Sequence, residues 1–82
     1  MNNKKDIEVG DIYEDCAYHP VLCMGREGFE IWGISLIDGS QPRSCDVEHC
    51  GVVKLTCDEA WDIKINGPKD NEARSTISKK WW

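Results

Sequence analysis

Cysteine and histidine side chains gather in two short segments, and they are the side chains in this sequence best suited to holding a metal ion. Residues 16–23 have the pattern Cys-x2-His-x3-Cys, and residues 45–50 have the pattern Cys-x3-His-Cys. Zinc is commonly bound by four nitrogen or sulfur ligands that come in pairs from separate segments. The spacing matches no standard zinc finger, so structural zinc is one of several interpretations. Its candidate ligands are Cys16, His19, Cys45, His49 and Cys50.

Two other interpretations of the cysteines stay open. Free cysteine is among the most buried residue types, so Cys23 and one or two others can be small core residues of a protein without a cofactor. Alternatively, a cysteine thiolate with His49 as its base would suit nucleophilic catalysis. No oxyanion-hole motif, glycine-rich phosphate loop or spaced acid pair accompanies these residues. We therefore expect a protein that is not an enzyme.

Four other residues are candidates for contact with a partner. Tryptophan is enriched where interfaces concentrate their binding energy. Arginine beside serines can bind a carboxylate or phosphate, although pairing with a neighbouring acidic residue is the simpler expectation. The candidates are Trp32, Arg43, Trp81 and Trp82. The terminal tryptophans can equally dock on the protein itself. A helix carrying Trp61 and Ile65 is expected to cover the outer, apolar face of the sheet.

Short strands with tight connections are expected to position these residues. Alternation and β-branched content predict strands over residues 12–17, 21–24, 29–37, 43–47 and 52–55, with a turn over 25–28 and a 3₁₀ turn over 48–51. Asp38-Gly39 suits a tight hairpin turn. Thr56 and Glu59 have the spacing of a capping box, which predicts a helix that starts there and ends near Asn66, before Gly67 and Pro68.

The chain is expected to form one domain with a polar segment at each end. Residues 1–8 are expected to be disordered, residues 9–67 to form a barrel with one short helix, and residues 68–82 to be a flexible tail. Five short strands favour an antiparallel barrel, because closure hides the strand edges. A chain this short buries only about 60% of its unfolded surface, so a metal, a disulfide or a partner often contributes to its stability.

The order of these elements resembles the SH3-like barrels: a strand, a bent connection, three strands with tight turns, a 3₁₀ turn and a last strand. The resemblance covers Val9 to Leu55. The run GISLIDGSQPRSC followed by HCG is also similar to uncharacterised small bacterial domains, a resemblance that implies no activity. Peptide-binding SH3 domains carry an ALYDY-type segment and an interior Trp-Trp pair, which are absent here. The resemblance therefore implies a fold and not polyproline binding.

The charge of the chain indicates the class of partner. The net charge is −5, and the excess of acidic residues lies in residues 1–67. An acidic body repels a phosphate backbone, so a nucleic-acid-binding barrel is the less favoured alternative. The expected partner is another protein with a basic surface, and the expected function is that of an inhibitor or adaptor acting on a nucleic-acid-handling protein.

The sequence also suggests a location. It has no apolar run long enough to span a bilayer and no signal-peptide pattern at its N-terminus. Five cysteines is an odd number, which argues against a framework made only of disulfides. We therefore expect a cytoplasmic protein that does not enter a membrane.

Overall fold

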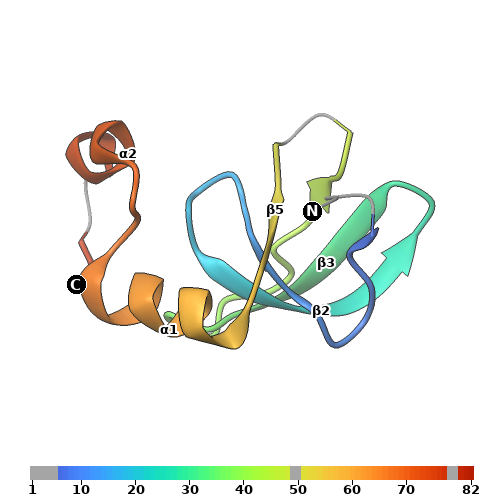
Figure 1. The fold of residues 1–82 in the computed structure, drawn as a ribbon. Coiled ribbons are helices and arrows are strands. Elements are labelled where there is room, and N and C mark those ends of the chain that lie inside the picture. The colour runs from blue at the N-terminus through green and yellow to red at the C-terminus, as the bar shows by residue number, and fades with distance from the viewer. Residues whose placement is uncertain (1–5, 49–50, 78–79) are drawn as a thin grey trace.

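The computed structural model describes residues 6–48, 51–77 and 80–82, in which five antiparallel strands form one curled half-barrel (Figure 1). The strands are ordered β4-β3-β2-β1-β5 across the sheet. The predicted fold class, a mainly β protein with five antiparallel strands and a short C-terminal helix, is confirmed. The strands are β1 (Ile12–Glu14), β2 (Pro20–Glu27), β3 (Glu30–Ser35), β4 (Cys45–Asp46) and β5 (Val53–Leu55).

The longest pairing joins β2 to β3, and two glycines allow it. A Cβ at Gly33 would lie 1.9 Å from the carbonyl oxygen of Leu22, so only glycine fits between these strands. Gly25 lies under the ring of Trp32, at a β-bulge. The turn predicted over 25–28 is therefore wrong. The Trp32 ring covers the strand where Gly25 has no side chain, β2 continues to Glu27, and the chain reverses at residues 28–29.

The tight hairpin predicted at Asp38-Gly39 is replaced by a wider loop. β3 ends at Ser35, and β4 pairs with it only through Ile31↔Cys45 and Glu30↔Asp46. Gly39 has a positive φ of 73° and donates its N–H to the Ser35 carbonyl, so it closes a local turn at the end of β3. Residues 40–44 form the rest of the loop, and β4 begins at Cys45.

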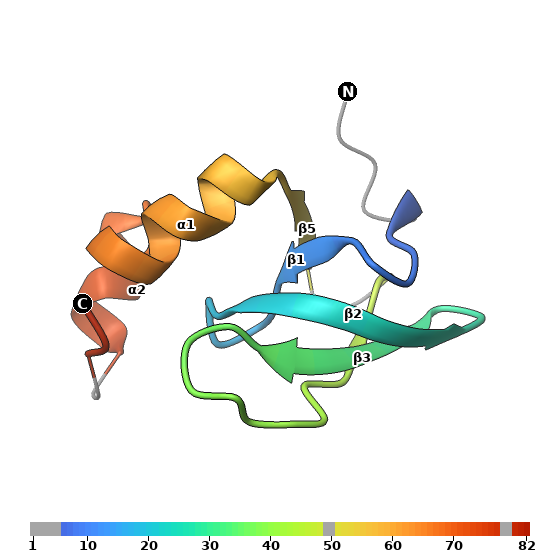
Figure 2. The same ribbon diagram turned by 90° about the horizontal axis from the view of Figure 1, so that it is seen from below.

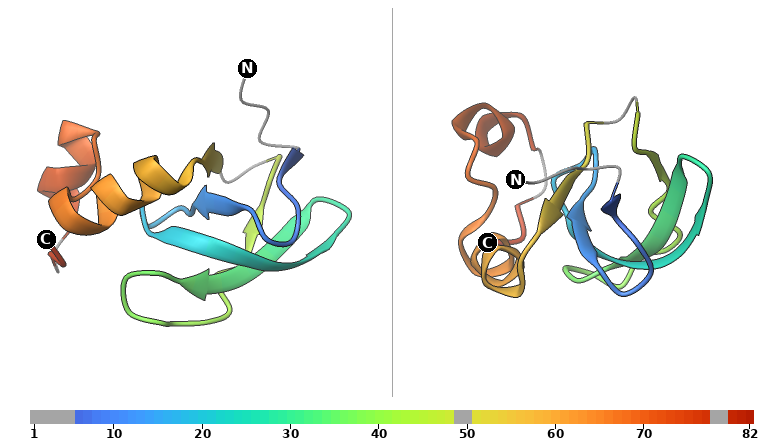
Figure 3. Two further views of the ribbon diagram at one scale, coloured as in Figure 1. Left: turned by 60° about the horizontal axis from the view of Figure 1, so that its bottom comes forward. Right: turned by 45° about the vertical axis from the view of Figure 1, so that its right-hand side comes forward.

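β1 is an interior strand of the sheet, because it pairs on both sides. Ile12 lies opposite Leu22 of β2 and opposite Leu55 of β5. Figure 3 shows the resulting curl of the sheet around its interior. Ile7 is fully buried in this interior, so it belongs to the core and not to the disordered segment predicted over residues 1–8. The core cluster consists of Ile7, Tyr13, Val21, Cys23, Ile31, Cys45, Val47 and Val52.

The helix α1 (Cys57–Asn66) has the predicted start and end. Its buried residues are Ala60 and Ile63, and it contacts β1, β2 and β5. Trp61 and Ile65 are 64% and 50% exposed, so the prediction that they cover the sheet is wrong. Residues 61 and 65 share one face of the helix, and α1 packs against the sheet through the opposite face.

The segment predicted as a polar tail contains a second helix, α2 (Asn71–Thr76), which starts where the side chain of Asp70 accepts the Glu72 N–H. Figure 2 shows both helices on the same side of the sheet, with α1 next to β5 and α2 farther out. The terminal tryptophans follow α2 and return to α1: the Trp81 indole N–H donates to the Ile63 carbonyl at 3.0 Å. Neither α1 nor α2 has the length and apolar character needed to cross a membrane.

Candidate functional site

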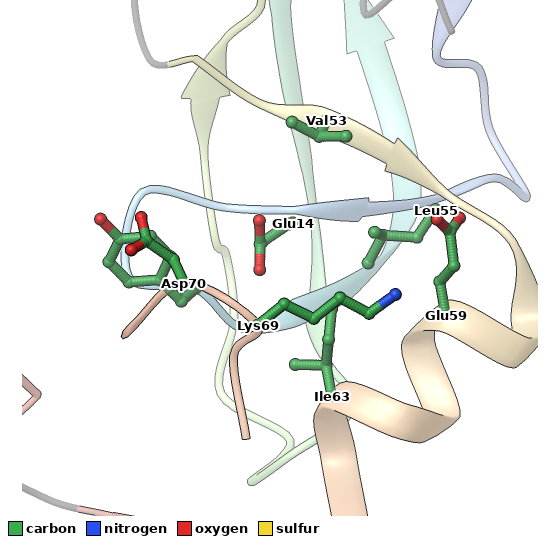
Figure 4. A pocket seen from close by; sticks show the side chains of 8 residues that line it. Glu14, Val53, Leu55, Glu59, Ile63, Lys69 and Asp70 are labelled. Carbon is green, nitrogen blue, oxygen red and sulfur yellow. The ribbon is translucent and has the colours of Figure 1, made fainter. Parts of the chain in front are cut away.

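A pocket of about 260 Å³ lies between β1, β5, α1 and the segment that leads to α2 (Figure 4). Its apolar lining comes from β5 and α1. Its charged groups come from the end of β1, the first turn of α1 and the link between the helices. The apolar residues are Val53, Leu55 and Ile63, the charged residues are Glu14, Glu59, Lys69 and Asp70, and Tyr18 also lines the pocket.

The environment of the pocket disfavours the negative charge of Glu14. Burial raises the pKa of its carboxyl group, the charges of Asp15 and Asp70 raise it further, and Lys69 opposes them. Within residues 6–48, 51–77 and 80–82, no hydrogen bond or ion pair satisfies this carboxyl group. A cation brought into the pocket would therefore stabilise the ionised form of Glu14.

Glu59 is held in place by the helix cap. Its Oε1 accepts the Thr56 N–H at 2.8 Å, while the Thr56 hydroxyl accepts the Glu59 N–H at 3.1 Å. The hydrogen bond from the Thr56 backbone lowers the pKa of Glu59, so this carboxylate is ionised at neutral pH. The capping box thus fixes a negative charge at the rim of the pocket, in addition to starting α1.

Lys69 shows what kind of group the pocket accepts. Its side chain runs across the pocket over Ile63, and its ammonium end lies on the side of Glu59 (Figure 4). An aliphatic stem on apolar atoms with a charged end at the rim is how lysine side chains usually cover apolar surface. The lining therefore suits an alkylammonium or guanidinium side chain.

A second polar cluster ties the β1–β2 connection to the segment before β4. Asp15 accepts the N–H groups of Ala17 and His19, each at 2.9 Å, which ends the first strand earlier than predicted. Its other oxygen accepts from Arg43 Nε at 2.8 Å, and the Arg43 carbonyl accepts from the Tyr13 hydroxyl at 2.7 Å. The side chains of Asp15 and Arg43 are only 6% and 21% exposed, so this ion pair is largely shielded from water.

The predicted metal ligands are brought together only in part. The sulfur atoms of Cys16 and Cys45 lie 3.6 Å apart. His19 turns elsewhere: its Nδ1 is 2.9 Å from the Ser35 hydroxyl, and its ring packs edge-on against Trp81. Burial, and then the charge of Arg43, lowers the pKa of His19, which favours the neutral imidazole.

The rest of the predicted metal site, His49 and Cys50, lies outside the described residues, and so do these two central residues of the predicted 3₁₀ turn. In the described part of the chain, no group of three or more histidine, cysteine, aspartate or glutamate side chains is arranged to hold a metal ion. Structural zinc therefore stays a prediction.

The four predicted partner-binding residues lie at three separate places. Trp32 packs over Gly25, and Arg43 is engaged by Asp15 and by the Ser40 hydroxyl. Trp81 and Trp82 contact each other edge-on at the C-terminal end of α1, where the Trp82 ring also lies against Gly67. A role in binding stays a prediction for all four.

No pattern in the sequence predicted this pocket. Its only member recognised there was Glu59, and for its capping role. The signal that was available is an acidic residue, Glu14, within the alternating strand predicted over 12–17, but nothing local shows that β5 and the link between the helices enclose it. Searches against models of protein families, curated proteins and solved structures found no match.

Proposed function

We propose that this protein is a small, non-catalytic, SH3-like barrel that binds another protein by taking a lysine or arginine side chain of that protein into the pocket at Glu14. The observation that carries the proposal is the half-buried Glu14 carboxyl group, whose pKa is raised by burial and which makes no hydrogen bond or ion pair within the described residues. A basic side chain supplies the missing positive charge.

The apolar atoms of the pocket support the same occupant. Val53 and Ile63 offer a surface for the methylene stem of a basic side chain, and Glu59 and Asp70 offer charge at the rim. Lys69 already occupies part of this space, so it is the group that a partner's side chain would displace (Figure 4). When a basic side chain of the partner replaces Lys69, the carboxylates of the pocket keep a positive charge beside them.

Exposed apolar side chains elsewhere on α1 and β5 favour a protein partner over a small molecule. Trp61 and Ile65 project from the outer face of α1, and Val53 of β5 is also exposed. An exposed tryptophan next to other apolar side chains is typical of an interface. The net charge of −5 favours a basic partner and disfavours nucleic acid.

The experiment compares capture of proteins from the source cell by three immobilised baits: the wild-type protein, a Glu14→Gln/Asp70→Asn variant and a Glu27→Gln/Glu30→Gln control. Both variants lose two negative charges, but the control changes exposed residues at the β2–β3 turn, outside the pocket. We expect a basic protein that the wild-type and control baits retain and the pocket variant loses.

The captured protein is then purified and titrated against the same three baits at low and high salt. Equal affinity for the pocket variant and the control would refute the role of the pocket. Tight, salt-dependent binding of a labelled oligonucleotide to the wild-type protein would instead favour the nucleic-acid-binding alternative.

A further inference from the structure

The thiols of Cys16 and Cys45 form a pair that the pocket does not use. Cys16 is exposed in the β1–β2 connection, and Cys45 starts β4 with 6% of its surface exposed. Their sulfur atoms are 3.6 Å apart, close to van der Waals contact, whereas the bond of a disulfide is about 2.05 Å. A small movement of the two side chains would bring the sulfur atoms to bonding distance.

The backbone on both sides of this thiol pair is already fixed. Asp15, the residue before Cys16, is bonded to Arg43, which lies two residues before Cys45. The Tyr13 hydroxyl holds the Arg43 carbonyl, and Cys45 itself pairs with Ile31 in the sheet. Contacts that do not involve sulfur therefore hold the two segments side by side. The disulfide can form without a large movement of either segment.

The thiol pair is also accessible from one side. A shallow surface hollow of about 250 Å³ is lined by both cysteines together with Ala17, Pro42 and Ser44. A small reagent can therefore approach the exposed Cys16, and the more buried Cys45 lies beside it.

We propose that Cys16 and Cys45 form an intramolecular disulfide by exchange with a low-molecular-weight disulfide such as oxidised glutathione. The Cys16 thiolate attacks one sulfur of the reagent, forms a mixed disulfide and releases one thiolate. The Cys45 thiolate then attacks the Cys16 sulfur and releases the second. The two cysteines lose two protons and two electrons, and the reagent gains them as two thiols. This modification site is independent of the proposed binding function.

The reduced protein is incubated with oxidised glutathione, its remaining thiols are alkylated, and its peptides are mapped by mass spectrometry without reduction. We expect a peptide that joins Cys16 to Cys45 and a higher thermal midpoint for the oxidised protein, because a cross-link restricts the unfolded chain. Cys45→Ser should leave Cys16 as a persistent mixed disulfide. Cys57→Ser removes an exposed thiol on α1 and should leave the cross-link unchanged.

Circular dichroism of each variant establishes that it is folded, and the map of the wild-type protein tests the pairing without any substitution. The proposal is overturned if Cys16 joins Cys50 in place of Cys45. It is also overturned if Cys16 and Cys57 are glutathionylated equally with no cross-link, or if the purified protein holds zinc that protects Cys16 and Cys45 from oxidation.

Discussion

The ion pair between Asp15 and Arg43 should contribute measurably to stability, unlike the more exposed pair of Asp11 and Lys54. Arg43 Nε lies 2.8 Å from Asp15, and the two side chains are 21% and 6% exposed. Lys54 Nζ lies 3.3 Å from Asp11, with side chains 37% and 30% exposed. A short, shielded, charge-assisted hydrogen bond is stronger than an exposed pair that exchanges readily with water.

Two double-mutant cycles compare these pairs. One combines Asp15→Asn with Arg43→Met, and the other combines Asp11→Asn with Lys54→Met. Asparagine retains an oxygen for the neighbouring N–H groups, and methionine retains an apolar stem, so each cycle isolates the charge interaction. We expect a coupling energy of about 1–3 kcal/mol for the first pair and below about 1 kcal/mol for the second.

Urea unfolding is a suitable assay. A chain of this size loses about 1 kcal/mol of stability per molar urea, so a loss of 2 kcal/mol lowers the midpoint by about 2 M. The total stability of a domain of this length is about 4–12 kcal/mol, which leaves the single variants enough to fold. Coupling energies that are equal for the two cycles would refute the conclusion that shielding distinguishes the pairs.

Three further predictions concern the helix cap, Glu14 and zinc. Thr56→Ala should lower the free energy of unfolding by about 1 kcal/mol, whereas Thr76→Ala at the end of α2 should change it little; an unchanged urea midpoint for Thr56→Ala would contradict the cap. The raised pKa of Glu14 means that its contribution to stability is full below the ordinary value of 4.5 and is lost as the pH rises through the higher folded value. Glu14→Gln should therefore raise the thermal midpoint near pH 7 and give no gain at acid pH, and a gain that is the same at both would count against this origin. If Cys16 and Cys45 belong to a zinc site, a strong chelator should release about one zinc per chain and lower the thermal midpoint; an unmoved midpoint in a preparation without zinc would exclude the site.

Local sequence signals predicted α1 correctly because a capping box needs only residues that are three positions apart. Thr56 and Glu59 make both of the expected hydrogen bonds, and Gly67 ends the helix with a positive φ of 87°. The strand pattern was sufficient for the number of strands and for their antiparallel arrangement. These features depend on propensities within a few residues.

The errors arose where distant residues decide the outcome. Gly25 looked like part of a turn because its cover, the Trp32 ring, comes from the neighbouring strand. Trp61 and Ile65 looked like core residues because they are apolar and share one face of α1, yet α1 buries Ala60 and Ile63 on its other face. The pocket at Glu14 depends on β1, β5 and the link between the helices at once, and no local pattern describes such an assembly.

The pairing of β1 with both β2 and β5 also has a consequence for how the chain is made on the ribosome. Ile12 can meet Leu22 as soon as β2 has been synthesised, but it cannot meet Leu55 until β5 has followed. The β2–β3 hairpin is built from neighbouring segments and can form early, while one edge of β1 stays open. Unpaired strand edges attract other nascent chains. Until β5 emerges, the free edge of β1 is therefore open to such pairing.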